Sequence, residues 1–475
     1  MKQIVCLLIL SVLLHITLQA QDVSRQLYEK YEQYKEETIT QRRFKHADLA
    51  SLLQTLRNVA DFEVIPIGKS IQSRMIYMVK LGTGPTKILL WSQMHGDEPT
   101  ATMASLDIFK FFKQKDDLDP IRQEILNNTT LYFIPMLNPD GAQVYQRRNA
   151  LDIDLNRDAL RLQSPEAQLL KHIRDSLDAD FGFNLHDQST YYTAGVSDKS
   201  ATVSFLAPAY DYEKSVNEVR EKALQLIVTL NEVVQAFAPG HAGRYNDAFE
   251  PRAFGDNIQK WGTSTVLVES GGYPDDPEKQ YIRQLNFVLL LTGLHAIATG
   301  SYQENNTDDY YQIPGNERYL YDLVVRNATL TAFGNAYTID LGINRYEIEY
   351  DNHSKFYYSS SISDVGDLSV YHGYEELDAT GMMMVPGKIY PKRQRNIKKL
   401  LQLDAKELLK EGYTTVRVKK MKGHEEVRNS FPLDIIGKKQ TPAYTLGIGT
   451  RPDFILVKDD VPRHAVVNGF VHALE

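Results

Sequence analysis

The sequence predicts a strand and then a helix, with a short segment of three polar residues and one glycine between them. Residues 87–93 form an apolar run with the length and aliphatic content of a buried strand. Residues 101–112 carry apolar side chains at helical spacing, and Pro99 suits the first turn of a helix. His95-Gly96-Asp97-Glu98 lies between them. Ligands bind at the carboxyl ends of strands in open α/β sheets, so His95 and Glu98 could point at one metal ion.

The pattern of strands and helices continues for about 300 residues and predicts an α/β domain with a largely parallel or mixed sheet. Turn signals separate the segments, among them Asn138-Pro139-Asp140-Gly141. The expected strands are 62–68, 75–81, 87–93, 130–137, 180–185, 201–206 and 265–268, and the main expected helices are 99–112, 164–177, 212–237 and 276–298.

Two further polar residues, His186 and Glu269, also follow directly after expected strands. Two imidazoles and one carboxylate, from His95, Glu98 and His186, suit a catalytic zinc with an open coordination position. Glu269 would act as the general base toward a water molecule activated by that zinc. A metal-bound histidine usually needs an acceptor for its other ring nitrogen, and Asp154 and Asp187 are the candidates.

Several arginines could supply positive charge to such a site. Arg147, with Arg148 as the alternative, could stabilise an oxyanion. Arg157 together with Asn156 could bind a carboxylate bidentately. If that carboxylate is the end of a peptide chain, the enzyme is an exopeptidase.

At these residues the sequence resembles the zinc metallocarboxypeptidase family of the carboxypeptidase A type, whose known zinc site has two histidines and one glutamate. The resemblance implies an eight-stranded mixed sheet with helices on both faces and one Zn²⁺ per chain. It also implies that Arg147 polarises the scissile carbonyl, that Asn156 and Arg157 hold the terminal carboxylate, and that Asp154 supports the first zinc histidine. The matching segments are His95-Gly96-Asp97-Glu98, Asn138-Pro139-Asp140-Gly141, Arg147-Arg148-Asn149, Asp154-Leu155-Asn156-Arg157, His186 and Glu269-Ser270-Gly271-Gly272.

The substrate pocket departs from the family pattern. The family often continues Asn-Arg-Asn-Phe, whereas Asp158-Ala159 follows Arg157 here. A tyrosine on the substrate side is expected some twenty residues before the catalytic glutamate, and Tyr245 is the nearest candidate. Asp256 would favour a basic side chain at the cleaved end if it lines the specificity pocket. A turn aspartate is the alternative interpretation of Asp256.

The N-terminus has the features of a secretory signal peptide, with Lys2, an apolar core over residues 4–14 and the small residue Ala20 at the expected cleavage site. The apolar run is too short for a full membrane span, so no stable membrane insertion is expected after cleavage. Cys6 is the only cysteine, and the mature protein would have no disulfide. The net charge of −8 provides no basic field for nucleic acid and disfavours acidic membranes.

The chain changes character after residue 300. A polar stretch, 303–309, is expected to be a linker, and short alternating runs with Gly and Asn turns then predict strands. One helix is expected from about Gln394 to Leu409. We therefore predict a signal peptide over 1–20, a catalytic domain over 21–300 and a β-rich accessory domain over 301–475.

The sequence thus predicts a secreted or periplasmic zinc carboxypeptidase that hydrolyses the last peptide bond of a substrate with a free C-terminal carboxylate. Three alternatives stay open. The protein could be an amidase for peptides derived from peptidoglycan, a deacylase of small amides or esters, or a zinc-binding module without catalytic activity.

Overall fold

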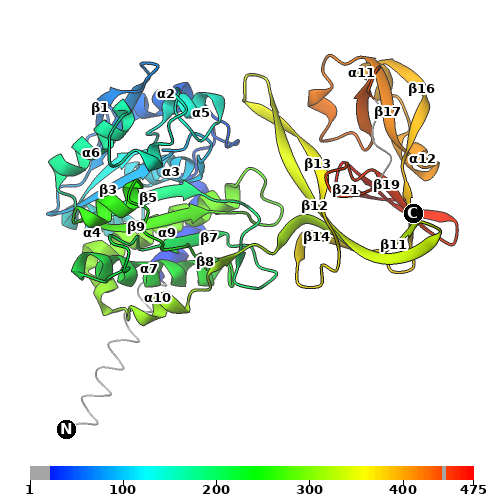
Figure 1. Ribbon diagram of the computed structural model, residues 1–475. Coiled ribbons are helices and arrows are strands. Elements are labelled where there is room, and N and C mark those ends of the chain that lie inside the picture. The colour runs from blue at the N-terminus through cyan, green and yellow to red at the C-terminus, as the bar shows by residue number, and fades with distance from the viewer. Residues whose placement is uncertain (1–21, 441–445, 475) are drawn as a thin grey trace, which may run out of the picture. The chain divides into compact units, whose positions relative to one another are not determined.

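The computed structural model describes residues 22–440 and 446–474, so the predicted signal peptide and Cys6 lie outside the described residues (Figure 1). The chain divides into two compact units, the first ending at Arg318 and the second beginning at Tyr319. Each unit has its own hydrophobic core and is described by itself. The segment predicted as a linker, 303–309, instead contributes to η2 and α10 of the first unit.

The first unit is built on an eight-stranded mixed sheet in the order β1-β2-β4-β3-β5-β9-β7-β8. Strands β4, β3, β5 and β9 are parallel to one another, whereas β1, β2 and β7 join by antiparallel pairing. This confirms the predicted fold class. The strands are β1 (Glu63–Lys69), β2 (Met75–Leu81), β3 (Thr86–Ser92), β4 (Thr129–Ile134), β5 (Phe181–Asp187), β7 (Val203–Leu206), β8 (Ala242–Arg244) and β9 (Ser264–Ser270), with a separate small pair of β6 (Thr193–Ala194) and β10 (Asn316–Glu317).

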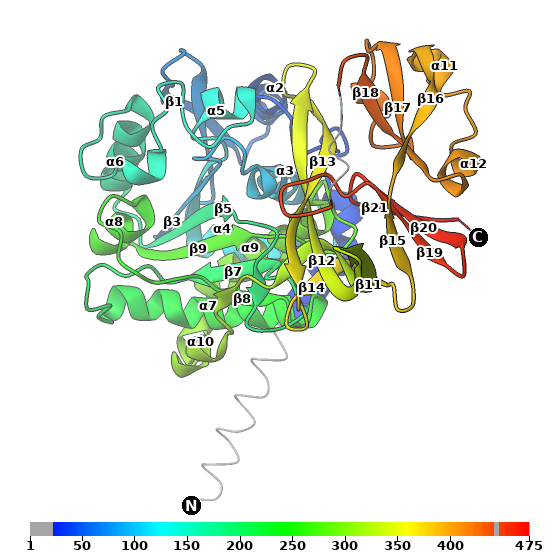
Figure 2. The same ribbon diagram turned by 45° about the vertical axis from the view of Figure 1, so that its right-hand side comes forward.

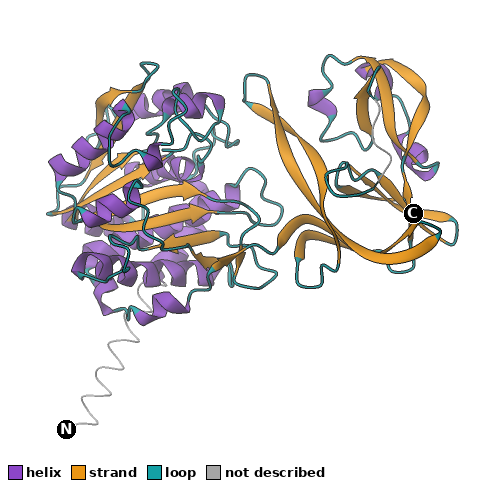
Figure 3. Cartoon of the chain, viewed as in Figure 1, coloured by secondary structure: helices purple, strands orange, loops and turns teal. Residues whose placement is uncertain are grey.

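Helices cover both faces of this sheet (Figure 3). Residues 22–34 are helical, and the structure then has α2 (His46–Leu56), α3 (Thr100–Lys113), α4 (Asp119–Asn128), α5 (Pro139–Val144), η1 (Leu155–Arg157), α6 (Pro165–Leu177), α7 (Glu218–Phe237), α8 (Phe254–Lys260), α9 (Gln280–Thr299), η2 (Ser301–Glu304) and α10 (Asp308–Gln312).

The two faces of β3 show how the core is divided. Ile88 and Leu90 pack with the helices of one face, α3, α4, α7 and α9 among them, whereas Leu89 and Trp91 pack with α6 and α8 on the other. Successive side chains of a strand point to opposite faces, so a strand covered on both sides is apolar throughout. Helix α9 is the one described helix long and apolar enough to span a membrane, but 78 % of that stretch is buried inside the protein.

Two local expectations for the first unit differ from the structure. Asn138-Pro139-Asp140-Gly141 opens helix α5 instead of forming an isolated turn, because Asn138 Oδ1 accepts the Gly141 amide and Pro139 occupies the first helical position. Helix α7 begins at Glu218, after the Asn217 cap, and not near residue 212. The predicted cap of α6 is present, since Ser164 Oγ accepts the Ala167 amide.

The second unit contains an eight-stranded sheet with the order β13-β12-β11-β15-β19-β20-β21, in which β14 also pairs with β11, and a three-stranded sheet of β16, β17 and β18 (Figure 2). The β-rich character was predicted from its alternating runs. The strands are β11 (Leu320–Ala332), β12 (Asn335–Tyr350), β13 (Lys355–Gly366), β14 (His372–Asp378), β15 (Met383–Pro386), β16 (Lys388–Asn396), β17 (Tyr413–Lys420), β18 (Asp434–Gly437), β19 (Phe454–Lys458), β20 (Val461–Val467) and β21 (Phe470–Ala473), with η3 (Glu425–Val427).

The single helix predicted over 394–409 is wrong. The structure has two short helices, α11 (Ile397–Leu400) and α12 (Ala405–Lys410). Asn396 caps the first, and Asp404 Oδ1 accepts the Glu407 amide to begin the second. An aspartate in this position starts a new helix in preference to continuing the previous one.

Candidate metal centre and substrate cleft

The loop between β3 and α3 is held rigidly. Gln93 has a left-handed backbone, with φ of 49°, and is buried. Its Nε2 donates to the Gly96 carbonyl at 2.9 Å, and its Oε1 accepts from Thr102 Oγ1 at 3.1 Å. A strained non-glycine backbone of this kind persists only where its surroundings determine it. Gly96 leaves no room for a side chain, because a Cβ there would lie 2.0 Å from the Gly141 carbonyl carbon.

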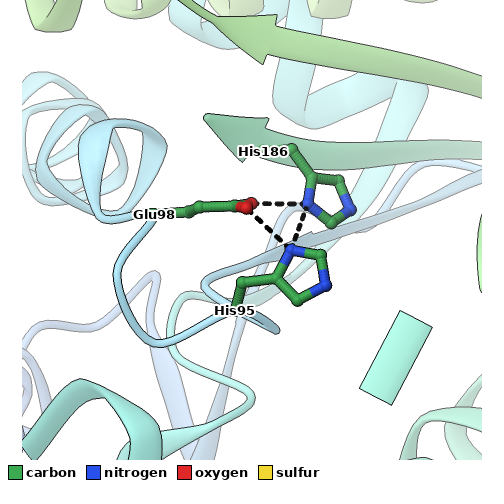
Figure 4. Close-up of side chains that lie close together, drawn as sticks. All are labelled: His95, Glu98 and His186. Carbon is green, nitrogen blue, oxygen red and sulfur yellow. Dashed lines mark hydrogen bonds and ion pairs between the residues drawn. The ribbon is translucent and has the colours of Figure 1, made fainter. Parts of the chain in front are cut away.

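Three side chains converge beyond this loop, His95, Glu98 and His186 (Figure 4). All three are buried. His95 Nδ1 lies 2.8 Å from Glu98 Oε1, and His186 Nδ1 lies 2.6 Å from Glu98 Oε2. The two Nδ1 atoms are 3.1 Å apart. His186 comes from the end of β5, so the strand-end placement predicted from the sequence is what brings the three together.

This donor set fits zinc. A tetrahedral zinc ion with ligand distances of about 2.0–2.1 Å holds its ligand atoms about 3.3 Å apart, close to the separations found here. The electrostatic potential at this site also favours the binding of a cation. Burial alone would lower the pKa of His95, but Glu98 and Asp154 outweigh it and raise that pKa to about 9. The two imidazoles in turn hold the pKa of Glu98 well below its usual range, against the effect of burial.

Asp154 orients the first histidine. Its Oδ1 lies 3.0 Å from His95 Nε2, which is the contact expected for this aspartate. Its Oδ2 accepts from Arg147 Nε at 3.1 Å. Arg147 Nη1 also donates to Glu98 Oε1 at 3.1 Å, so this guanidinium lies directly beside the three converging side chains. Arg148, the alternative, instead donates to the Asp152 carbonyl and does not line the cleft.

Asp187 does not accept from a histidine ring, so that interpretation of Asp187 is wrong. Its Oδ2 accepts from Thr100 Oγ1 at 2.6 Å and from Lys279 Nζ at 3.0 Å. Its backbone amide donates to Glu98 Oε2 at 3.2 Å. His186 Nε2 has no hydrogen-bond partner within the described part of the chain.

Glu269 lies beside His186, because the parallel pairing of β5 with β9 places these two residues opposite each other. The side chain is buried, and Oε2 finds no hydrogen-bond partner among residues 22–440 and 446–474. Burial, with the nearby Glu98 carboxylate, raises the pKa of Glu269 well above its usual range. A carboxyl group in such surroundings is suited to exchanging protons.

These groups line one cleft of about 300 Å³, which also contains the predicted substrate residues Asn156, Arg157 and Tyr245. Asn156 Oδ1 accepts the Phe254 amide at 2.8 Å, which leaves its Nδ2 as the free donor. Arg157 is partly exposed and lies 3.5 Å from Glu250. Burial and the Glu269 carboxylate raise the pKa of Tyr245 to about 12, so its hydroxyl stays protonated.

Asp256 also lines the cleft and is buried. Its Oδ1 accepts the Glu250 amide at 2.9 Å, and burial raises its pKa to about 6. The polar lining residues that were not identified from the sequence include Asn184 and Glu250. Asn184 has a buried Oδ1 without a partner in the described residues, and a polar residue inside an apolar strand was the available signal. Glu250 gave no such signal, because its ion pair with Arg157 depends on the fold.

The mixed α/β sheet and the buried His–Glu–His set at its strand ends define the first unit as an α/β domain with a candidate zinc site. Comparison with known proteins then finds a family model that this unit resembles. Residues 50–233 match the zinc carboxypeptidase profile, peptidase M14. The matched segment is less than half of this chain.

Individual relatives are distant. The chain is similar to carboxypeptidase SOL1 of Arabidopsis thaliana, with 29 % identity over 174 residues, or 30 % of this chain and 35 % of that protein. It is 26 % identical over 107 residues to human carboxypeptidase D, covering 19 % of this chain and 8 % of the relative. A metallo-carboxypeptidase structure from Burkholderia cenocepacia aligns with 55 % of this chain and 70 % of its own, at 18 % identity and a TM-score of 0.45. The matched region is thus at most about a third of these two curated relatives.

Proposed function

We propose that this protein is a zinc-dependent carboxypeptidase that removes the C-terminal residue of a peptide. The observation that carries the proposal is a single cleft holding the three zinc-type ligands, a buried carboxyl at Glu269 and two arginines, Arg147 and Arg157. A metal site alone would fit many hydrolases. Arg157 and the side-chain amide of Asn156 lie in this cleft away from the metal ligands, and they favour a substrate with a free carboxylate.

Substrate binding begins at Arg157 and Asn156. The Arg157 guanidinium can hold the terminal carboxylate, and Asn156 Nδ2 is free to donate to the same group because its Oδ1 is already engaged by Phe254. The Tyr245 hydroxyl lies on the same cleft and can donate to the bound peptide. These contacts set which peptide bond reaches the zinc ligands.

Zinc held by His95, Glu98 and His186 would supply Lewis acidity and an easily deprotonated water. Glu269 takes the proton of the attacking water and then delivers it to the nitrogen of the leaving amino acid. Arg147 donates to the oxygen that becomes negative as the carbonyl is attacked.

We further propose that the cleft prefers a basic residue at the cleaved end. Asp256 is a buried carboxyl on the cleft wall, and Glu250 adds a second carboxylate nearby. A lysine or arginine side chain of the substrate would pair with Asp256, whereas a neutral side chain would leave that group desolvated.

The decisive experiment measures zinc content and hydrolysis of a panel of peptides, for wild type and Glu269→Gln side by side. We expect one zinc in both proteins, release of single C-terminal residues by wild type, and a loss of about 10²–10⁴-fold in kcat for the variant. Glu232→Gln is the matched control, since Glu232 is a half-buried glutamate of α7 outside the cleft.

Each of the other outcomes supports one of the alternative functions. Zinc binding without peptide cleavage would overturn the peptide substrate and direct the search to cell-wall peptides and to small amides or esters. Zinc binding without hydrolysis of any of these substrates would support a zinc-binding module without catalytic activity. Blocking the C-terminal carboxylate as an amide should abolish cleavage, and unchanged cleavage would exclude the role proposed for Arg157.

We propose, finally, that the protein is exported. The support is the apolar core of residues 4–14 behind Lys2, followed by Ala20. Cell fractionation with N-terminal sequencing tests this. A protein that starts just after Ala20 and lies outside the cytoplasm is expected, and an intact N-terminus in the cytoplasm would refute export.

A further inference from the structure

A basic segment interrupts the otherwise acidic chain. The whole sequence has a net charge of −8, yet residues 388–439 contain 15 Lys and Arg against six Asp and Glu. This segment is the part of the second unit that forms β16, β17, β18 and the helices α11 and α12. The whole chain is therefore acidic, whereas this segment is basic. The expectation that acidic membranes are disfavoured does not apply to this segment.

The three strands run parallel, and one face of their sheet is buried. Val416, Val418 and Ile435 pack with the side chains of α11 and α12, including Leu400 and Leu409. Figure 2 shows β18, β17 and β16 side by side with these helices. Because side chains alternate between the faces of a strand, the residues next to the buried ones must point to the opposite face.

Those neighbours form a row of cations. Gln394, Val418 and Gly437 are in register across the three strands, so the next residues of β16 and β17 lie side by side and the residue that directly follows β18 comes next to them. These next residues are Arg395, Lys419 and Lys438, and all three are exposed. Strand spacing places three such residues within about 10 Å. None of the three makes an ion pair with another described residue.

More cations follow at the same edge, because the carboxyl ends of parallel strands lie together. Lys398 and Lys399 come just after β16, Lys420 and Lys422 at the end of β17, and Lys439 after β18. All five are exposed. Leu401, which directly follows α11, is 52 % exposed and adds an apolar side chain to this basic sequence.

Like charges opposite one another on a sheet destabilise the fold. A row of three, without acidic partners, therefore indicates a surface that an anionic partner neutralises. We propose that the face of Arg395, Lys419 and Lys438, with the lysines of the adjoining strand ends, binds the surface of an anionic phospholipid membrane. The protein would then be held at a membrane peripherally, without a spanning segment.

The layout favours a membrane over a linear polyanion. The cations spread over the end of a sheet, helix α11 and the turns that follow β17 and β18, which matches an array of lipid phosphates. Aromatic side chains that could stack on bases are absent from the positions that make up this basic surface, and proteins that bind single-stranded nucleic acid usually present them. Peripheral membrane surfaces instead combine cations with exposed apolar side chains such as Leu401.

The test is co-sedimentation of the full mature chain with phosphatidylglycerol vesicles and with phosphatidylcholine vesicles, at low and high salt. We expect binding to the first only, weakened by salt. The triple variant Arg395→Gln, Lys419→Gln, Lys438→Gln should bind about 100-fold more weakly, at about fivefold for each charge lost near the surface. Thermal unfolding of each protein checks that it is folded.

The matched control is Arg57→Gln, Lys113→Gln, Lys115→Gln, which removes the same charge from exposed positions of the first unit. It should bind like wild type. Equal loss in the control would show a net-charge effect and overturn the proposed surface. Equal binding of wild type to both lipids, or to neither, would also overturn it. Binding to heparin or to a single-stranded oligonucleotide but not to vesicles would identify a polyanion as the partner instead. The lipid and salt comparisons use wild type alone, so they stand even if the variant misfolds.

Discussion

His95 Nε2 and Asp154 Oδ1 lie 3.0 Å apart, on the side of the imidazole that faces away from Glu98. The carboxylate therefore fixes the ring so that Nδ1 points at the other two ligands. Neighbouring contacts of this kind raise the basicity of a ligating histidine and set its orientation. Because Asp154 also accepts from Arg147 Nε, one side chain positions both a metal ligand and the cation beside it.

Replacing this carboxylate should weaken zinc binding. Asp154→Asn keeps the shape of the side chain but removes its charge, so we expect zinc affinity to fall by about 10–100-fold. Competition with a chelator of known affinity measures the change. Asp152→Asn, an exposed aspartate of the same loop, is the control and should leave affinity unchanged. Equal affinity of Asp154→Asn and wild type would contradict the orienting role.

Asp256 predicts a pH-dependent choice of substrate. Its pKa of about 6, raised by burial, means that it is mostly neutral below that pH and charged above it. The preference for C-terminal lysine over leucine should therefore grow as the pH rises through about 6. The ratio of kcat/KM for the two peptides, measured from pH 5 to 8, tests this. In Asp256→Asn the ratio should be low and flat.

An exposed aspartate provides the comparison for this experiment. Asp275→Asn lies in a turn outside the cleft and should keep the pH-dependent ratio of wild type. If wild type cleaves lysine and leucine peptides equally at every pH, Asp256 has no part in specificity and acts only as the acceptor for the Glu250 amide.

The zinc ligands were predictable because the signal is local and repeated. His95 follows the apolar strand β3 and His186 lies at the end of β5, and parallel strands end at one edge of the sheet. Register then brings Glu269 beside His186 without any further information. A residue that acts together with a residue of the neighbouring strand can therefore be predicted where the sequence defines both strands well.

Other features could not be found in this way. Asn138-Pro139-Asp140-Gly141 has the composition of a turn, but the same residues also suit a capped helix start, and packing decides between the two. The partner of Asp187 is Lys279, 92 residues away in the chain. A buried ion pair between such distant positions leaves no periodic pattern, which is why Asp187 was wrongly assigned to a histidine ring.

The loop that carries His95 and Glu98 should not tolerate a side chain at Gly96. A Cβ there would lie 2.0 Å from the Gly141 carbonyl carbon and 2.2 Å from the Ala142 nitrogen, so the backbone must shift. We expect Gly96→Ala to reduce both zinc content and stability, the latter by about 1–3 kcal/mol. Gly315→Ala, where a Cβ meets nothing, is the control. Unchanged zinc content in Gly96→Ala would show that the loop can move without disturbing its ligands.

The ion pair of Lys279 with Asp187 joins the ends of β5 and β9 behind the metal ligands. Lys279 Nζ donates to Asp187 Oδ2 and to the Ser270 carbonyl, both at 3.0 Å, and both charged side chains are 8 % exposed. Lys279→Met would leave the carboxylate buried without its partner, which costs about 3–5 kcal/mol. Urea unfolding measures this change in the free energy of unfolding. The zinc-free protein is used because a difference in bound metal then cannot contribute to the result.

The double variant separates a lost pair from a general packing defect. If the uncompensated charge is the cause, adding Asp187→Asn to Lys279→Met should recover part of the lost stability, because the unpaired carboxylate is gone. Lys260→Met, an exposed lysine of α8, should change stability little. A double variant as unstable as the sum of the two single variants would show that the side chains act independently. The ion pair would then have no special part in joining the strands that carry His186 and Glu269.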